Sequence, residues 1–323
     1  MPFPQFDRSR LQVLPFAQRD SDVDIGVMIG LEEALPPFEH AALPVLAQDL
    51  AAARNKGAAA LWMYGAHVIR SGCGPHMIAV MHSRLATHFA TNGAGAIHDY
   101  ELARFGRTCE SVGRYISEGQ FGLWAECGEM NDIIAAGVRD GLGLGEAVGR
   151  HIWEEKLPHR EQSVLGVAYH LGIPATVHVG IGNDIIHEHP NCDGAILGAA
   201  SYTDFLVYTE TVTKLEGGVF LNFGSAVTGP EVYLKALAMA RNVARQEGRR
   251  IARFTTAVFD MQPLGGGPVG EAPPKDDPRY YFRPWKTILA RTVADGGTSY
   301  YVQGAHRHTL PHLARLALAC VGG

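Results

Sequence analysis

A glycine-rich segment with titratable neighbours is the first part of this sequence that could do chemistry. The segment Thr91 to Glu101 begins with Asn92-Gly93-Ala94-Gly95 and continues to His98 and Asp99. Glycines let the backbone approach a phosphate, and the free N–H groups and dipole of a helix N-terminus favour negative charge. Between a strand and a helix, this pattern predicts a loop that binds a cofactor, although a plain tight turn is the simpler interpretation of one short motif. His98 and Asp99 would lie at the same mouth, where they could move a proton.

Two further glycine loops repeat this arrangement. In the first, His67 comes directly after the apolar run Ala58 to Tyr64, and Ser71-Gly72 leads toward a helix. The second, Gly224-Ser225, separates an expected strand from a long expected helix. Because the carboxyl ends of parallel strands lie at one edge of a sheet, these loops are expected to meet in one crevice. We therefore expect the three loops to hold one cofactor, with His67 close to the substrate.

The stretch after the expected strand 175–179 is rich in histidine and acidic residues. These residues are His178, Asp184, His187, Glu188, His189 and Asp193. Imidazole and carboxylate groups bind divalent metal ions, so one interpretation is a metal site made by His178, Asp184, His187 and His189. The alternative is a polar loop in which Asp184, Glu188, His189 and Asp193 bind an amine substrate and His187 takes part in catalysis. No spacing of the H-E-x-x-H kind decides between the two.

Lys286, which follows Trp285, is the last lysine in the chain. A buried lysine can have a lowered pKa and act as a base or a nucleophile. A surface lysine at the start of a helix is the ordinary alternative, because lysine side chains are mostly exposed. We keep Lys286 as a candidate catalytic residue.

The elements that must position these residues alternate between short apolar strands and helices. About six strands are expected, at 58–64, 87–90, 175–179, 218–223, 254–259 and 299–303. Apolar runs without alternation are typical of strands that are covered on both faces. The pattern predicts an α/β fold: a Rossmann-like parallel sheet with helices on both faces.

The domain organisation follows from the same pattern. Residues 1–42, which are rich in Pro, Asp and Glu, are expected to form an N-terminal arm, and residues 43–323 a single Rossmann-like α/β domain. The irregular segment 261–284 is too long for an ordinary connection, so it is expected to be a lid or a subunit contact.

Composition narrows the class of protein. Charged residues make up 19% and hydrophobic residues 46% of the chain, as in an ordinary globular protein. The net charge of −5 offers no basic surface for nucleic acid. The five cysteines form no C-x-x-C pair, and we expect neither a signal peptide nor a membrane span. These features favour a cytoplasmic protein with reduced thiols.

The order of the loops resembles that of deoxyhypusine synthase and its bacterial relatives. The similarity is carried by 65–72, 92–99, the loop ending at Asp193-Gly194, Ser201-Tyr202 and the closing segment 295–302. The resemblance implies NAD at the carboxyl ends of the strands and a homotetramer with active sites between subunits. Ser71 and Gly72 match a loop that contacts NAD, Asn92 to Ala94 match the family's turn at the cofactor, and His98 falls where the family has a glutamate.

The resemblance also implies hydride transfer from an amine such as spermidine to NAD. In that family an aminobutyl group then passes to an acceptor through an imine on a lysine. Here the family's Trp-Gly-Lys segment is replaced by Gly304-Ala305-His306-Arg307-His308. We therefore expect an NAD-dependent enzyme acting on an amine or polyamine-like substrate, by dehydrogenation or aminoalkyl transfer. The alternatives are a metal-dependent hydrolase that uses the 178–193 loop, and a non-catalytic nucleotide-binding homologue.

Overall fold

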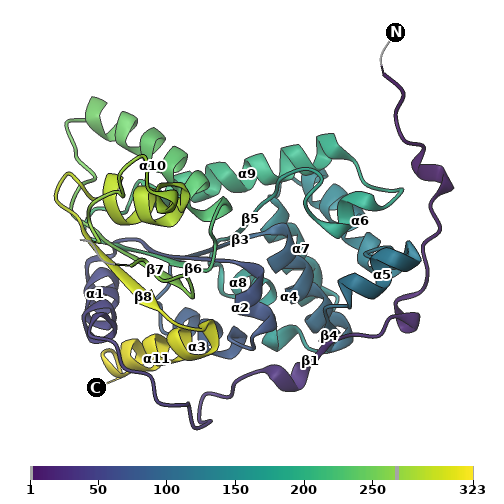
Figure 1. Cartoon of the computed structure of the whole chain (residues 1–323), viewed down its shortest axis with the longest axis horizontal. Coiled ribbons are helices and arrows are strands. Elements are labelled where there is room, and N and C mark those ends of the chain that lie inside the picture. The colour runs from purple at the N-terminus through teal and green to yellow at the C-terminus, as the bar shows by residue number, and fades with distance from the viewer. Residues whose placement is uncertain (1–2, 266–268, 323) are drawn as a thin grey trace.

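The computed structural model of the chain describes residues 3–265 and 269–322, and a parallel sheet of six strands lies at its centre (Figure 1). The strands are β2 (Ala60–Tyr64), β3 (His88–Asn92), β5 (Ala175–His178), β6 (Val219–Phe223), β7 (Thr255–Asp260) and β8 (Thr298–Gln303). Each overlaps one of the strands expected from the sequence.

The order of strands across this sheet is β5-β3-β2-β6-β7-β8. Counted along the chain this is 3-2-1-4-5-6, the order of doubly wound dinucleotide-binding folds. The residue at the centre of β2, Trp62, lies opposite Phe89 on one side and Leu221 on the other. The order reverses between β2 and β6, and a crevice is expected at that point because the following loops leave toward opposite faces. The predicted Rossmann-like parallel α/β fold is confirmed.

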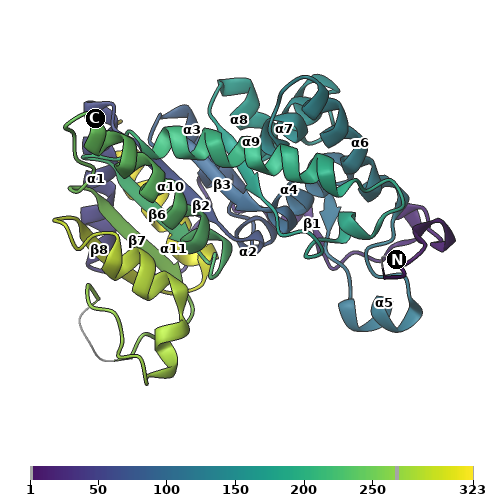
Figure 2. The same ribbon diagram turned by 90° about the horizontal axis from the view of Figure 1, so that it is seen from above.

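Helices cover both faces of the sheet. One face carries α1 (Ala42–Lys56), α2 (Ala66–Arg70), α3 (Gly74–His82), α4 (Gly93–Phe105), α7 (Leu144–Glu154), α8 (Val164–Leu171) and α11 (His306–Ala319). The other face carries α9 (Gly194–Val212) and α10 (Thr228–Gln246), which lie in front of the strands in Figure 2, and the π-helix η7 (Pro284–Arg291). Among the described residues, no helix is long and apolar enough to cross a membrane.

The hydrophobic core has two layers because strand side chains alternate between the faces. Trp62 and Tyr64 pack into the layer under α1, α3 and α11, whereas Leu61 and Met63 pack into the layer under α9 and α10. All four side chains are buried. Burying one large apolar side chain contributes about 1.5–3 kcal/mol, so this central strand anchors both layers.

The described part of the expected arm is attached to the domain rather than free. It forms short turns, η1 (Arg8–Arg10), η2 (Phe16–Gln18) and η3 (Ile25–Val27), and the strand β1 (Val23–Asp24). Strand β1 pairs antiparallel with β4 (Arg107–Thr108), and Phe16 packs with Trp124 in a small separate core. Nearby are α5 (Val112–Glu118) and α6 (Ala125–Arg139). Residues 1 and 2 of the expected arm lie outside the described residues.

The segment 261–284 is irregular in its described part apart from the 3-10 turn η6 (Pro278–Tyr281). Residues 266–268 of this segment lie outside the described residues. Its use as a lid or as a subunit contact stays a prediction.

The start of α4 differs from the sequence expectation. The glycines of the Asn92 to Gly95 segment were expected in a loop between a strand and a helix, but α4 already begins at Gly93. Asn92 caps the helix, because its Oδ1 accepts a hydrogen bond from the N–H of Gly95 at 3.0 Å. Helix α9 begins in the same way at Gly194, where Asp193 caps it through the N–H groups of Ala195 and Ile196.

Candidate functional site

A cavity of about 280 Å³ lies beside the N-terminal half of α4 and the loop that follows β5. Its acidic and basic lining residues are Arg70, His98, Glu101, Glu110, Asp184 and Glu188, joined by Arg19 of the arm. The loops that line it follow β3 and β5, so the cavity lies at the carboxyl edge of the sheet, where ligands of this fold class bind. Of the predicted site residues, the structure brings Ala94, His98, Asp184 and Glu188 together here.

His98 is held by a residue from outside its own helix. Its Nδ1 lies 2.7 Å from Oγ1 of Thr108, at the end of β4, and its Nε2 has no hydrogen-bond partner among the described residues. Burial is the largest influence on this imidazole and lowers its pKa to about 4, although Glu101 acts in the opposite direction. His98 is therefore neutral near pH 7 and could accept a proton in the cavity.

Glu101 lies three residues after His98 on α4 and is buried. Arg19 donates to both carboxylate oxygens, at 2.8 and 2.9 Å, and each side chain of this pair is only 1% exposed. Cys127 and Thr108 also donate to the carboxylate, at 3.0 and 2.6 Å. Burial alone would raise the pKa of Glu101, but the hydrogen bonds and charge of Arg19 hold that pKa below its usual value.

The carboxylate of Asp184 lies at the N-terminus of α4, where the sequence predicted the phosphate of a bound cofactor. A Cβ atom at Gly93 would lie 2.1 Å from Oδ2 of Asp184, so only glycine allows this approach. Burial raises the pKa of Asp184 to about 6, and a hydrogen bond from the Ala94 backbone partly opposes the shift. The glycine at position 93 thus has a structural reason, and the positive end of the helix dipole already meets a carboxylate.

The loop around Asp184 is fixed by His187. Nδ1 of His187 accepts hydrogen bonds from the backbone N–H groups of Gly182 and Asp184, at 3.1 and 3.2 Å. Its Nε2 is 3.9 Å from Oδ2 of Asp184. Glu188 is exposed at the mouth of the cavity, and its pKa is raised by burial and by the neighbouring Glu110. In this arrangement His187 shapes the loop that presents Asp184 and Glu188.

Asp99 lies apart from the cavity. Its carboxylate accepts hydrogen bonds from Oγ of Ser163 at 2.6 Å and from the N–H groups of Val164 and Leu165 at 2.8 and 3.0 Å. These groups form the N-terminus of α8, so Asp99 stabilises the packing of α8 on α4. The residue next to His98 in sequence therefore has a structural role in this fold.

The residues proposed as metal ligands point in different directions. His178 is buried under α9, within 3.1 Å of Thr176 Oγ1, and His189 Nε2 lies 2.9 Å from the carbonyl oxygen of Gly122. In residues 3–265 and 269–322, no group of three or more His, Cys, Asp or Glu side chains could hold a metal ion. Asp193 is exposed and caps α9. The 178–193 loop thus divides into separate structural contacts.

The crevice expected at the reversal of strand order would lie between the loops after β2 and β6. A Cβ atom at Gly65 would lie 2.7 Å from the carbonyl oxygen of Gly224, so the two backbones approach closely there. Ser225 is buried, and its Oγ accepts a hydrogen bond from the N–H of Gly229 at the start of α10. His306 is buried beside Gly224, and its Nδ1 has no partner among the described residues. Exposed His67 lies near enough to lower the pKa of both His306 and His98.

Two other residues that were predicted at the site, Gly72 and Lys286, make contacts elsewhere in the structure. Gly72 has φ +81°, and a Cβ atom there would lie 2.0 Å from the carbonyl oxygen of Val27 in the arm. The arm therefore covers the backbone next to Ser71. Lys286 is buried in η7, on the opposite face of the sheet from α4, with Nζ 3.8 Å from the ring centre of Tyr280.

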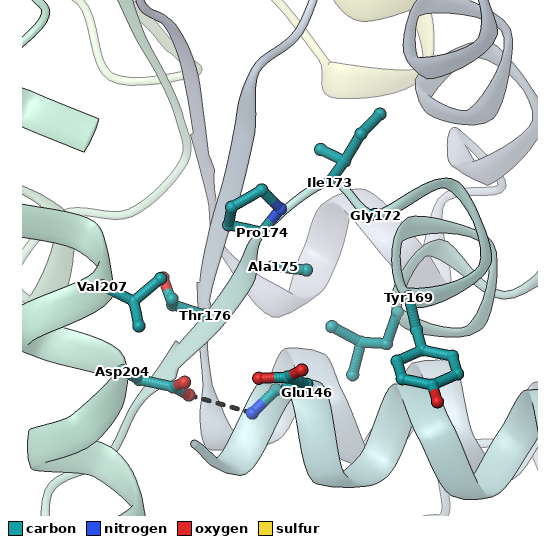
Figure 3. A pocket seen from close by; sticks show the side chains of 11 residues that line it. Glu146, Tyr169, Gly172, Ile173, Pro174, Ala175, Thr176, Asp204 and Val207 are labelled. Carbon is teal, nitrogen blue, oxygen red and sulfur yellow. Dashed lines mark hydrogen bonds between the residues drawn. The ribbon is translucent and has the colours of Figure 1, made fainter. Parts of the chain in front are cut away.

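A second cavity, of about 200 Å³, lies at the other end of β5 (Figure 3). Pro174 and Ala175, at the amino end of the strand, line it together with Glu146, Tyr169 and Asp204. Ligands of doubly wound folds bind at the carboxyl ends of strands, so this cavity is on the wrong edge for a cofactor. Its buried carboxylate, Asp204, serves the backbone instead, through a 2.9 Å hydrogen bond from the N–H of Gly145.

Several residues that line the first cavity were not predicted from the sequence: Arg19, Arg70, Glu101, Cys109 and Glu110. Thr108, which contacts His98 from behind the cavity lining, was not predicted either. Glu101 could have been found, because residues three apart on a helix share a face and His98 was already a candidate. Arg19 and Thr108 carry no local signal. They reach the site only because β1 and β4 pair.

No family model and no curated protein matches this sequence. Solved structures match it in fold. The apo structure of ArgZ, an arginine dihydrolase from the ornithine–ammonia cycle in cyanobacteria, is 14% identical with a TM-score of 0.50 over 88% of this chain. The AgrE ternary complex with ornithine and NAD+ is 14% identical with a TM-score of 0.51 over 85% of this chain. A conserved LOR/SDH protein from Methanococcus maripaludis S2 is 13% identical with a TM-score of 0.50 over 95% of this chain.

The extent of these matches differs. This chain spans 33% of the ArgZ chain and 32% of the AgrE chain, but 74% of the LOR/SDH chain. At such low identity the similarity establishes a shared fold and no more. The structures named here are not deoxyhypusine synthases, so what the comparison supports is the Rossmann-like architecture. The fold and the cavity together define a Rossmann-like α/β protein with a charged cavity at the carboxyl edge of its sheet.

Proposed function

We propose that this chain is an NAD-dependent enzyme that dehydrogenates a small amine or amino acid. The observation that carries the proposal is a cavity that combines a neutral histidine with several carboxylates, placed at the carboxyl edge of a 3-2-1-4-5-6 sheet. Charged clefts of this kind, with groups of perturbed pKa, are typical of active sites.

Doubly wound folds bind a dinucleotide at the point where the strand order reverses, so we place the cofactor there. The backbones of Gly65 and Gly224 approach each other closely at this point, and Nε2 of the buried His306 lies beside Gly224, while its Nδ1 has no partner among the described residues. We assign cofactor binding to Gly65, Gly224 and Ser225, with Ser71 and the Asn92–Gly95 segment at the start of α4 nearby. When bound, NAD would supply the acceptor for a hydride from the substrate. AgrE, which has a similar fold, was crystallised with NAD+ and ornithine, and this supports the choice of NAD.

The charges of the cavity favour a substrate with an amine. Asp184 and Glu188 can hold an ammonium group at one end. Arg70 is exposed at the same cavity and has no salt-bridge partner among the described residues, so it could hold a carboxylate. A small amino acid with a second amine would match both ends, and ornithine and L-arginine are the molecules crystallised with AgrE.

His98 would act as the base. Its unpartnered Nε2 in the cavity can take the proton that leaves the substrate amine when the hydride leaves carbon. None of the residues that line this cavity, all of which lie in the described ranges, is a lysine. The proposal therefore favours dehydrogenation over aminoalkyl transfer, and Lys286 has no role in it.

Calorimetric titration with NAD+ tests the cofactor assignment. We expect Gly65→Ala to weaken binding by at least about tenfold, because the new Cβ would displace the backbone of Gly224. The matched control is Gly198→Ala on α9, where a Cβ meets nothing within 4 Å, and it should bind like the wild type. Absence of heat with the wild-type protein at millimolar NAD+ would show that the proposal is wrong.

The alternative of a catalytically inactive nucleotide-binding protein predicts a different outcome. NAD+ would bind, yet no amine or amino acid would reduce it. The position of His98 in the cavity favours an enzyme. Screening NAD+ reduction with ornithine, arginine, lysine and spermidine separates the two.

A further inference from the structure

A line of side chains connects the N-terminal arm to the cavity. Arg19 of the arm binds both oxygens of Glu101, Glu101 accepts a 2.6 Å hydrogen bond from Thr108, and Thr108 Oγ1 lies 2.7 Å from Nδ1 of His98. Arg19, Glu101 and Thr108 are buried, so water does not compete for these contacts. Each group in this line has a known number of protons to donate. The donor in each hydrogen bond therefore follows from the preceding contact, starting at Arg19.

Glu101 can only accept hydrogen bonds in this line of side chains. Arg19 can only donate, and Cys127 donates its S–H to the same carboxylate at 3.0 Å. A buried guanidinium that binds both oxygens favours the ionised carboxylate. An ionised carboxylate has no proton to give, so the hydrogen bond between Glu101 and Thr108 uses the hydroxyl proton of Thr108.

Because Thr108 donates its hydroxyl proton to Glu101, it can only accept a hydrogen bond from His98. A threonine hydroxyl has one proton, and that proton is engaged by Glu101. Its oxygen must then accept from His98, so Nδ1 of His98 carries a proton. The only other contact of this nitrogen among the described residues, Cys109 Sγ at 3.9 Å, is too long to compete.

We propose that Thr108 is a positioning residue that holds His98 in its Nδ1-protonated form, so that Nε2 presents its lone pair to the cavity. The tautomer is a property of the protein alone, and only the use of that lone pair as a base rests on the proposed function. The arm is part of this device, because β1 pairs Val23 with Thr108 and Arg19 neutralises Glu101. Cys109 has φ +63°, an uncommon value for a residue other than glycine, so the backbone at this corner is held in one particular conformation.

Nuclear magnetic resonance of the ¹⁵N-labelled full chain without cofactor tests the inference directly. Long-range ¹H–¹⁵N correlation spectra distinguish a protonated ring nitrogen from one that carries a lone pair, and the His98 signals are identified by their loss in His98→Gln. In the wild type we expect a protonated Nδ1 and an unprotonated Nε2. Thr108→Ser, which keeps the hydroxyl, should give the same pattern, whereas Thr108→Val, which removes the acceptor, should move the proton wholly or partly to Nε2.

Two results would overturn the inference: a wild-type His98 protonated at Nε2, or an unchanged His98 spectrum in Thr108→Val. If Thr108→Val does not fold, as judged by circular dichroism, the wild-type and Thr108→Ser spectra still decide. The experiment needs no NAD and no substrate. Failure of NAD+ to bind in the calorimetric titration would therefore contradict the proposed function without contradicting the inferred tautomer of His98. Spectra that contradict the tautomer would in turn leave the binding of NAD+ unaffected.

Discussion

His98 and Asp99 show how strongly the function of a residue depends on the face of the helix to which it belongs. Successive residues on a helix point about 100° apart, so one can face a cavity while the next faces the core. His98 lines the cavity with a free Nε2, and Asp99 is buried against the start of α8. Only His98 has a position from which it could move a substrate proton.

Replacing His98 should therefore remove turnover and spare cofactor binding. We expect His98→Gln to lower the rate of NAD+ reduction by about 10²–10⁴-fold, the usual contribution of a positioned general base. The measurement is turnover with whichever amine reduces NAD+ in the screen, alongside calorimetric binding of NAD+. His82→Gln, at an exposed position at the end of α3, is the control and should behave like the wild type. Equal turnover in His98→Gln and His82→Gln would contradict the role of His98.

At the scale of elements, the arm and α4 are joined by one buried ion pair. Arg19 and Glu101 are both almost fully shielded, and the ring of Phe16 lies 4.0 Å from the guanidinium carbon of Arg19. Such a pair is weak evidence of net stability, but removing one partner leaves an uncompensated charge in the core. The arm is thereby committed to one position on α4.

The double-mutant cycle of this pair should show strong coupling. We expect Arg19→Met to lower the free energy of unfolding by about 3–5 kcal/mol, and Arg19→Met with Glu101→Gln to recover part of the loss. Denaturant-induced unfolding provides the measurement. The exposed pair of Arg114 with Asp20 is the control, and Arg114→Met should change stability little. Additive effects at positions 19 and 101 would show that the pair does not hold the arm.

The edge strand β5 is tied to α7 and α9 by Asp204. Its Oδ2 accepts hydrogen bonds from Gly145 at the start of α7 and from Val177 in β5, at 2.9 and 2.7 Å (Figure 3 shows the first). Burial raises the pKa of Asp204 to about 7, although these backbone N–H groups act in the opposite direction. An edge strand presents unpaired backbone groups, and here one carboxylate satisfies some of them.

This carboxylate should make stability depend on pH. Because its pKa is raised above the usual value of an aspartate, the folded state holds the proton more tightly than the unfolded state. The contribution of Asp204 to stability is therefore lost as pH rises from about 4 through about 7. We expect the unfolding free energy of Asp204→Asn, relative to the wild type, to increase over that window and to level off above it. Glu210→Gln, a change at an exposed position on the same helix α9, is the control. A difference curve for Asp204→Asn that is flat from pH 4 to pH 8 would contradict the assignment.

At the scale of the whole molecule, the sheet order decides where a ligand can bind. Strands 1 and 4 of the 3-2-1-4-5-6 order are β2 and β6, which brings Gly65 to Gly224 although they are far apart in the sequence. The cavity beside α4 lies at the same edge. The homotetramer implied by the resemblance to deoxyhypusine synthase stays a prediction, as does the division into a 1–42 arm and a 43–323 domain.

The strands, the helices and the fold class could largely be predicted from the residues alone. Strands β2, β6 and β7 were visible as short apolar runs, because burial on both faces selects apolar residues continuously along the chain. The edge strand β8 is mostly exposed or half-buried and contains more polar residues. Alternation of these runs with helices then indicates parallel strands joined by crossovers, which is a local pattern. The three glycine loops and His98 were found for the same reason, since turn and helix-start signals depend on neighbours in sequence.

The roles of these loops depend on contacts between distant segments of the chain. Gly72 is explained by the arm that crosses it, and Gly93 by the carboxylate of Asp184, both contacts between distant parts of the chain. Arg19 and Thr108 became parts of the candidate site through a strand pairing that spans more than eighty residues. Such contacts depend on how whole elements pack, and packing leaves no periodic mark on the residues that meet. The sequence could therefore name His98, but only the fold shows that its Nδ1 lies against Thr108 while its Nε2 has no hydrogen-bond partner among the described residues.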